Sequence, residues 1–116
     1  MKNRTMKKLV YFLDDEVFLS EIFQEYFETE DVDVMVFNHP KEAIEACLSN
    51  PPDIMLIDYR LPEMIGLEVA EIIDDKIIKI LMTGELAPPA NDLFKLTINK
   101  PYKLESLKSI ILDVDL

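Results

Sequence analysis

The side chains in this 116-residue chain that could do chemistry follow short apolar segments. They are three carboxylates, a hydroxyl and an ammonium: Asp14 and Asp15 after residues 9–13, Asp58 after 54–57, Thr83 after 77–82 and Lys100 after 96–99. Two carboxylates about 4 Å apart repel each other by about 1 kcal/mol in water and about 4 kcal/mol at an effective dielectric constant of about 20. A hard divalent cation such as Mg²⁺ removes that repulsion, so the set suits Mg²⁺ binding.

The same side chains suit phosphoryl transfer. A carboxylate is a competent nucleophile for this reaction and gives an acyl phosphate. The Lys100 ammonium is a point charge suited to a phosphoryl oxygen, and the Thr83 hydroxyl is a small donor. A simpler interpretation treats each residue as a helix cap or a turn residue. It could explain Asp15 and Glu16, which precede the next helix, and we keep it for Glu16, but it makes the gathering of all the other residues at one edge a coincidence.

The elements that must position these residues follow from the alternation of apolar runs with helical patterns. Strands are predicted at 9–13, 32–37, 54–57, 77–82 and 96–99, and helices at 17–27, 40–49, 66–75 and 104–114. Continuous apolar runs are typical of parallel strands covered on both faces, which predicts an open, doubly wound α/β sheet. Ligands of such sheets bind beyond the carboxyl ends of the strands, where the polar residues collect.

Composition excludes several other kinds of site. The formal net charge of −11 disfavours direct binding to nucleic acid, because phosphate backbones are repelled. Cys47 is the only cysteine and His39 the only histidine, so an internal disulfide and a Cys/His zinc site are excluded. No segment approaches a membrane span, and the apolar run after the basic start is too short for a signal peptide. We expect one cytoplasmic domain over residues 1–116, with 1–7 as a loose lead.

Four motifs resemble the receiver domain of two-component response regulators, over essentially the whole chain. They are "DDE" at 14–16, "DYRLPEMIG" at 58–66, "TG" at 83–84 and "KPY" at 100–102. Any one of them is weak, but all four occur in order and each follows an apolar strand. The resemblance implies a flavodoxin-like five-stranded parallel sheet of order 2-1-3-4-5 with helices on both faces, in the stand-alone arrangement of chemotaxis-type receivers.

The resemblance also implies which residues accept the phosphoryl group and hold the metal. Asp58 would be the phosphoacceptor, modified by the phosphohistidine of a histidine kinase or phosphotransfer protein, or by a small phosphodonor. Asp14 and Asp15 would hold Mg²⁺, the first of them through a water molecule, together with Asp58 and the backbone carbonyl of Arg60. The domain would then be a phosphoacceptor rather than an enzyme, although family members catalyse their own phosphorylation and dephosphorylation.

Further roles are implied for residues around the acceptor. Thr83 would bond a phosphoryl oxygen and report phosphorylation, and Lys100 would pair with the phosphoryl group or, before it arrives, with the carboxylates. In the family, the side chains two positions after the acceptor and after the Thr modulate dephosphorylation. Here these are Arg60 and Glu85, which we expect to pair across the mouth of the site and shield it from water.

The chain departs from the family pattern in its output region. The usual switch aromatic, three residues before the lysine, is replaced by Thr97, and the nearby Tyr102 is out of register. The segment 83–100 is several residues short and contains two adjacent prolines, so the fourth helix of the family must be short or distorted. Ile65 replaces a common Asp before Gly66, which removes a turn-type hydrogen bond rather than chemistry.

Three functions are compatible with these features. The leading one is a Mg²⁺-dependent phosphoacceptor that signals to a downstream protein; an effector domain could follow if the chain is part of a longer regulator. The alternative is a receiver-like interaction module that is not phosphorylated in practice, which Thr97 and the short fourth helix favour. A small Mg²⁺-dependent phosphatase or phosphotransferase is the third, but no insertion is long enough to form the cap that such an enzyme needs.

Overall fold

Nine elements form the computed structural model, which describes residues 7–29, 31–85 and 92–113. In chain order they are β1 (Lys8–Leu13), α1 (Val17–Phe27), β2 (Val32–Phe37), α2 (Pro40–Ser49), β3 (Ile54–Asp58), α3 (Gly66–Ile72), β4 (Ile78–Thr83), β5 (Leu96–Asn99) and α4 (Leu104–Asp113). The strands form one parallel sheet of order β2-β1-β3-β4-β5. The predicted fold class and strand order are therefore confirmed.

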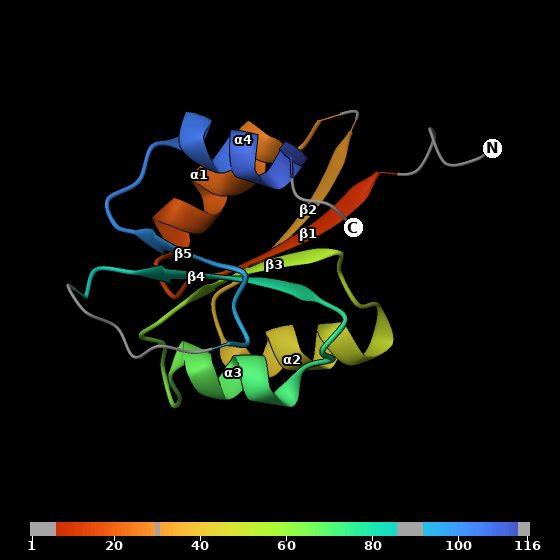
Figure 1. The fold of residues 1–116 in the computed structure, drawn as a ribbon, viewed down its shortest axis with the longest axis vertical. Helices are drawn as coiled ribbons and strands as arrows, with labels where there is room; N and C mark the ends of the chain where they lie inside the picture. The colour runs from red at the N-terminus through yellow and green to blue at the C-terminus, as the bar shows by residue number, and fades with distance from the viewer. Residues whose placement is uncertain (1–6, 30, 86–91, 114–116) are drawn as a thin grey trace.

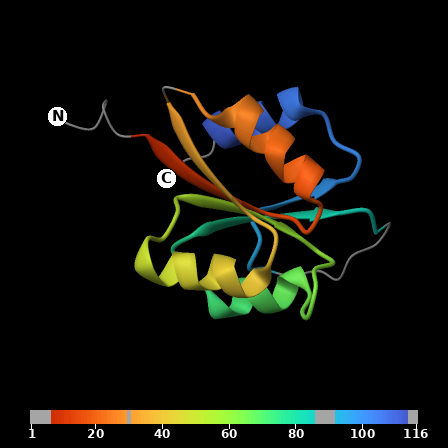
Figure 2. The same cartoon turned by 180° about the vertical axis from the view of Figure 1, so that it is seen from behind.

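Helices cover both faces of the sheet in a three-layer arrangement. α1 and α4 lie on one face, and α2 and α3 lie on the other (Figure 1). The view from behind shows the same two pairs on opposite sides of the strands (Figure 2). None of the helices among the described residues is long and apolar enough to cross a membrane.

Two apolar clusters, one on each face, account for the continuous apolar strands. Alternate residues of one strand point to opposite faces, so Val10 and Phe12 join the cluster under α1 and α4, whereas Tyr11 and Leu13 join the cluster under α2 and α3. β3 is buried over its whole length. These strands have no polar face because neither side of the sheet meets water there.

α3 is shorter than its predicted range of 66–75, because it ends at Ile72 and the next residue is already extended. Ile73 turns into the apolar cluster under α2 and α3, where it is buried. The Lys79 ammonium, from the neighbouring strand, donates to the carbonyl oxygens of Asp74 at 2.8 Å and Ile77 at 3.3 Å. These contacts favour a turn over another turn of helix.

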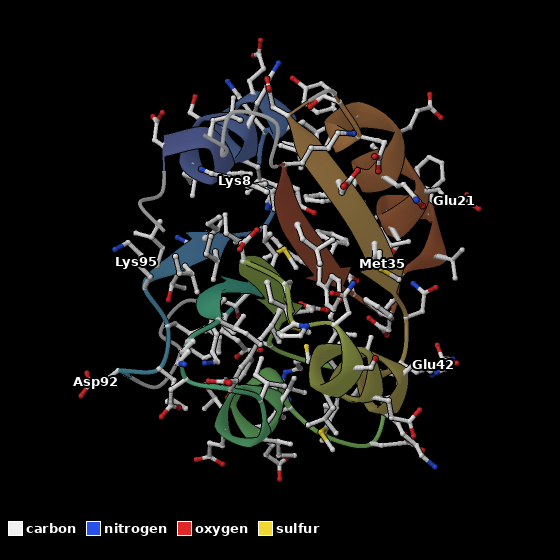
Figure 3. The ribbon with its side chains drawn as sticks, turned by 90° about the vertical axis from the view of Figure 1, so that its right-hand side faces the viewer. Lys8, Glu21, Met35, Glu42, Asp92 and Lys95 are labelled. Carbon is white, nitrogen blue, oxygen red and sulfur yellow. The ribbon has the colours of Figure 1, made fainter. Side chains whose placement is uncertain are left out.

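The connection between β4 and β5 is the segment in which the sequence predicts a short or distorted helix. Residues 84–85 and 92–95, the part of the connection that the structure describes, contain no helix; residues 86–91, which include both prolines, lie outside the described range. Leu93 and Phe94 pack against the cluster under α2 and α3. Asp92 and Lys95 point outward from the segment that leads into β5 (Figure 3). β5 itself is largely exposed.

Lys8, the first residue of β1, contacts the last turn of α4, whereas residues 1–6 of the predicted loose lead lie outside the described range. The Lys8 ammonium donates to the carbonyl oxygens of Ile111 and Leu112, at 2.8 and 2.9 Å. Figure 3 shows Lys8 beside α4. These contacts satisfy carbonyl groups of the last helical turn, which have no partner within the helix.

Candidate functional site

The predicted site residues meet at the carboxyl edge of the sheet because of the strand register. Leu13 at the end of β1 lies opposite Ile57 in β3, so the residues that follow them, Asp14 just after β1 and Asp58 at the end of β3, lie side by side. Thr83, the last residue of β4, lies opposite Asn99 in β5, and Lys100 follows directly. Residues far apart in the sequence therefore arrive at one place.

Three carboxylates form a cluster at this edge. Asp14, Asp15 and Asp58 each offer an oxygen within 4.8 Å of the others. Asp14 and Asp58 are buried, whereas Asp15 is exposed. The ammonium of Lys100 lies 2.9 Å from Asp14 Oδ2 and 3.2 Å from Asp58 Oδ1. A single cation thus joins the two buried carboxylates.

The electrostatics of the cluster set the ionisation of Asp58. Burial and then the charge of Asp14 raise the pKa of the Asp58 carboxyl to about 6, because Lys100 offsets these effects only in part. The Lys100 ammonium is itself half-buried, which lowers its pKa, but its hydrogen bond and attraction to Asp14, followed by those to Asp58, outweigh burial and leave the pKa raised. The site therefore holds an excess of negative charge.

The donor set fits a hard divalent cation. All three clustered ligand atoms are carboxylate oxygens, which Mg²⁺ prefers to nitrogen or sulfur, and their mutual repulsion is relieved by a cation. The exposure of Asp15 leaves room for water or phosphate oxygens, which Mg²⁺ usually retains. Arg60 lies two residues after Asp58, and its backbone forms an isolated bridge with Ile65. The role of its carbonyl as a ligand stays a prediction.

Gly66 allows the loop after β3 to pack closely against the backbone of Asp58. A Cβ atom at this position would lie 2.4 Å from the backbone oxygen of Asp58, a distance that no side chain can adopt. The Gly66 amide also donates to the Tyr59 carbonyl at 2.7 Å. Ile65 has no side-chain acceptor for the turn-type hydrogen bond that an Asp would make at this position. The loss is offset in part, because the Ile65 amide donates to the Glu68 carboxylate at 3.0 Å.

Thr83 is buried at the end of β4, and its groups are engaged locally. Its hydroxyl accepts a hydrogen bond from the Glu85 amide at 2.9 Å, and its carbonyl accepts one from the Lys100 amide at 2.8 Å. The carbonyl contact couples the end of β4 to the site lysine. A hydroxyl that accepts from the backbone still has its own proton to donate, which a phosphoryl oxygen could accept.

The structure brings together Arg60 and Glu85. Arg60 Nε lies 2.9 Å from Glu85 Oε2, and the guanidinium lies over the Tyr59 ring, 5.4 Å from its centroid. The hydrogen bond to Glu85, followed by its charge, raises the pKa of Arg60. Both side chains are exposed, so solvent screens the pair. The loops after β3 and β4 are thereby linked outside the acidic cluster.

The predicted output residues occupy different environments. Thr97 is exposed on β5. Tyr102 is partly buried and packs against the cluster under α1 and α4. Burial, followed by the charge of Asp14, raises the pKa of the Tyr102 phenol to about 12. Their roles in output stay predictions.

Two polar residues that contact the site were absent from the prediction. Asn38 follows β2, whose carboxyl end lies at the same edge, and its amide reaches the Asp14 carbonyl. Ser20 is a buried hydroxyl in α1 that contacts Asn38. The position of Asn38 after a strand is the signal that could have identified it; Ser20 has no comparable signal in the sequence.

Comparison with known proteins agrees with this geometry. Residues 10–112 match the family model of the response regulator receiver domain. The chain is 29% identical over 101 residues to the transcriptional regulatory protein FlgR of Helicobacter pylori, covering 82% of this chain and 26% of that protein. It is 28% identical over 64 residues to the regulatory protein LuxO of Vibrio cholerae, covering 55% of this chain and 14% of LuxO. The chain therefore spans a small part of these two relatives.

A third relative has a similar length, and solved structures share the fold. Sporulation initiation phosphotransferase F of Bacillus subtilis is 25% identical over 114 residues, which cover 91% of this chain and 92% of that protein. A CheY-like receiver domain from Methylobacillus flagellatus superposes with a TM-score of 0.82 at 20% identity, over 95% of this chain and all of that one (100%). The non-phosphorylated HemR receiver domain from Leptospira biflexa has a TM-score of 0.83 at 20% identity, over 95% and 98%.

Proposed function

The chain belongs to the family of response regulator receiver domains, and from this premise we propose that it accepts a phosphoryl group on Asp58 in the presence of Mg²⁺ and signals this state to a partner protein. The observation that carries the proposal is the bridge from the Lys100 ammonium to Asp14 and Asp58, beside the exposed carboxylate of Asp15. This arrangement provides a nucleophile, oxygen ligands and a fixed cation within one small volume.

The site residues divide the reaction between them. A carboxylate oxygen of Asp58 forms a bond to phosphorus while the bond from phosphorus to the donor nitrogen or oxygen breaks, and the donor leaves with that electron pair. Lys100 balances the charge on the equatorial oxygens, and the Thr83 hydroxyl can donate to one of them. Asp14 and Asp15 would hold Mg²⁺, which supplies further neutralisation of phosphoryl charge when bound.

Phosphorylation would alter the contacts of Lys100. In the structure its ammonium is shared between Asp14 and Asp58, and its backbone amide is bonded to Thr83. A phosphoryl group on Asp58 brings new oxygens that compete for this ammonium and for the Thr83 hydroxyl. The change is thereby transmitted to the ends of β4 and β5, which adjoin the predicted output residues Thr97 and Tyr102.

The partners follow from the chemistry of the site. The donor would be the phosphohistidine of a sensor histidine kinase or of a histidine phosphotransfer protein, or a small phosphodonor, and the recipient of the signal would be a downstream protein. We place these events in the cytoplasm. The Arg60–Glu85 ion pair would lie at the mouth of the site and slow hydrolysis of the acyl phosphate by limiting the approach of water.

Phosphorylation with acetyl phosphate tests the proposal. We expect wild-type protein with Mg²⁺ to gain the mass of one phosphoryl group by intact-protein mass spectrometry. Asp58→Asn should gain none, and the matched variant Asp92→Asn, which makes the same chemical change on an exposed residue before β5, should gain as much as wild type. No gain in wild type, or an equal gain in Asp58→Asn, would contradict the proposal.

The alternative function, an interaction module that is not phosphorylated, is favoured by the output region. Thr97 is exposed where the family usually has an aromatic residue, and the described part of the β4–β5 connection contains no helix. Under this alternative, partner binding would be the same for wild type and Asp58→Asn, with or without the phosphoryl mimic beryllofluoride. A pull-down with these four samples separates the two functions.

A further inference from the structure

Two polar side chains outside the acidic cluster contact the backbone of Asp14. Asn38 Nδ2 lies 2.8 Å from the Asp14 carbonyl oxygen and 2.9 Å from Ser20 Oγ. Ser20 Oγ in turn lies 3.4 Å from the Asp14 carbonyl and 3.3 Å from the Glu16 carbonyl. A carbonyl oxygen only accepts hydrogen bonds, so the amide nitrogen of Asn38 must face it.

These contacts complete the hydrogen bonding of Asp14, which is fully buried. Its amide donates to the Phe37 carbonyl at 3.1 Å, its Oδ1 accepts from the Glu16 amide at 3.0 Å and its Oδ2 accepts from Lys100 at 2.9 Å. β1 ends at Leu13, so the Asp14 carbonyl lies beyond the strand ladder. A buried carbonyl without a donor would cost about 1–3 kcal/mol, and Asn38 supplies that donor.

Ser20 is a polar residue on the buried, apolar face of α1. It lies on the same face of α1 as Phe23 and Phe27, which are buried in the apolar cluster under α1 and α4. A hydroxyl on such a face is less favourable than an apolar side chain unless it is hydrogen-bonded. Here it receives the Asn38 amide, so the apolar face is interrupted only where it meets the Asp14 turn.

The carbonyl that Asn38 holds belongs to the peptide group that joins Asp14 to Asp15. Rotation of this peptide would swing the exposed Asp15 carboxylate relative to the buried carboxylates of Asp14 and Asp58. Holding the carbonyl in place therefore fixes the direction in which the second aspartate leaves the chain. Partners that orient metal ligands in this way typically contribute 10–100-fold to metal affinity.

We propose that Asn38 and Ser20 are positioning residues that set the Mg²⁺ affinity of the acidic cluster by fixing the Asp14–Asp15 peptide. This inference rests on the proposed Mg²⁺-dependent function. It assigns the polar residue after β2 to the site, although its side chain does not belong to the carboxylate cluster. Removal of the Asn38 amide should therefore weaken Mg²⁺ binding and the phosphorylation that depends on it.

The test is Mg²⁺ affinity measured by isothermal titration calorimetry on the full chain. Asn38→Leu keeps the approximate shape of the side chain and removes its donor, so we expect about tenfold weaker Mg²⁺ binding. Ser20→Ala should weaken binding in the same direction by about threefold, because Asn38 keeps its contact to the carbonyl. The matched control Asn50→Leu, at the opposite edge of the sheet after α2, should bind Mg²⁺ as wild type does.

A second readout separates positioning from a purely structural role. The Mg²⁺ concentration that gives half of the maximal phosphorylation rate with acetyl phosphate should rise about tenfold in Asn38→Leu, while the rate at saturating Mg²⁺ stays near that of wild type. A structural role alone would lower the unfolding temperature and leave the Mg²⁺ affinity of the folded protein unchanged. If Asn38→Leu does not fold, Ser20→Ala decides the question by the same two measurements.

The outcomes distinguish this inference from the proposed function. If wild type binds Mg²⁺ and both variants bind it equally well, the inference is wrong and the phosphoacceptor function stands. If wild type neither binds Mg²⁺ nor gains a phosphoryl group, both are wrong.

Discussion

The central strands β1 and β3 and the edge strand β5 differ in how deeply they are buried. β3 is buried at every position and β1 at its last four, whereas β5 is exposed at three of its four positions. Asp14 and Asp58 leave the buried strands, and Lys100 leaves the exposed one but pairs with both of them. The two buried aspartates therefore lie at the ends of strongly buried strands, and the lysine that pairs with both of them follows the largely exposed β5.

This difference has a mechanical consequence. Elements with little buried apolar surface open and rearrange at lower free-energy cost than the core strands. A change in the contacts of Lys100 would thus displace β5 before it disturbs β1 or β3. Thr97, which replaces the usual switch aromatic, lies in β5, the same strand that buries few of its side chains in the core.

Matched leucine truncations in a central strand and in the edge strand β5 should show the largest difference in stability. Leu56 in β3 is fully buried, whereas Leu96 in β5 is 40% exposed. We expect Leu56→Ala to lower the free energy of unfolding by about 3–4 kcal/mol, because it leaves a cavity, and Leu96→Ala by about 1 kcal/mol or less. Urea denaturation measures both losses. Equal losses would show that side chains of β3 and β5 contribute equally to stability.

The two glycines of the chain offer the next test. Gly66→Ala places a Cβ 2.4 Å from the Asp58 carbonyl oxygen, and we expect a loss of about 2–3 kcal/mol together with a lower phosphorylation yield. At Gly84, after β4, the described residues place no atom within 4 Å of the position that a Cβ would occupy, apart from Gly84 and its two chain neighbours, so Gly84→Ala should change stability by less than about 0.5 kcal/mol. Chemical denaturation and intact-protein mass spectrometry measure the two effects, and a tolerated Gly66→Ala would contradict the close approach.

The raised pKa of Asp58 predicts a pH dependence of stability in Mg²⁺-free buffer. Between the ordinary value of 3.8 and about 6 the folded state binds more protons than the unfolded state, so the free energy of unfolding falls as pH rises through this window. Asparagine does not titrate. Asp58→Asn should therefore gain about 2–3 kcal/mol relative to wild type between about pH 4 and about pH 7.

The control for this titration is an exposed aspartate outside the site. Asp92→Asn makes the same substitution on the segment before β5, and its stability curve should run parallel to that of wild type. Thermal unfolding in EDTA at several pH values measures all three proteins. A difference between Asp58→Asn and wild type that does not vary with pH would show that the Asp58 carboxyl has an ordinary pKa.

A strained residue in the loop after β3 predicts a smaller effect. Glu63 has a φ of 73°, which costs a non-glycine residue about 1 kcal/mol. Glu63→Gly should raise the free energy of unfolding by about 0.5–1 kcal/mol. Glu105→Gly, in the first turn of α4, should lower it by a similar amount, because glycine disfavours a helix. The same sign for both variants would contradict the strain.

The smallest effect is expected where the two loops meet. Arg60→Ala breaks the ion pair to Glu85 that we propose shields the acyl phosphate from water, so the phosphoryl group should be lost about threefold faster. The control is Lys95→Ala. It removes an exposed cation directly before β5, at the edge of the sheet opposite the site. Phosphate release after removal of the phosphodonor measures the rate, and a rate no faster than that of wild type would count against shielding by this pair.

Much of the fold could be predicted from local sequence patterns. The predicted ranges of α1 and β2 match the structure, because α1 has an apolar stripe of helical period and β2 is rich in β-branched and aromatic residues. The short strand predicted at 96–99 also matches β5. α3 was overestimated because its apolar spacing continues to Ile73, where that side chain packs from a turn instead of a helix. Periodicity reports which residues are buried, and it does not report where the backbone stops being helical.

The composition of the site follows from the sequence, whereas its contacts depend on the tertiary structure. Strand ends can be read from the chain, so Asp14, Asp58 and Lys100 could be assigned to one edge in advance. That Lys100 bridges two aspartates depends on a contact across 86 residues, and that Asn38 holds the Asp14 carbonyl depends on one across 24. Such contacts are set by strand register and side-chain reach, which local sequence patterns do not encode.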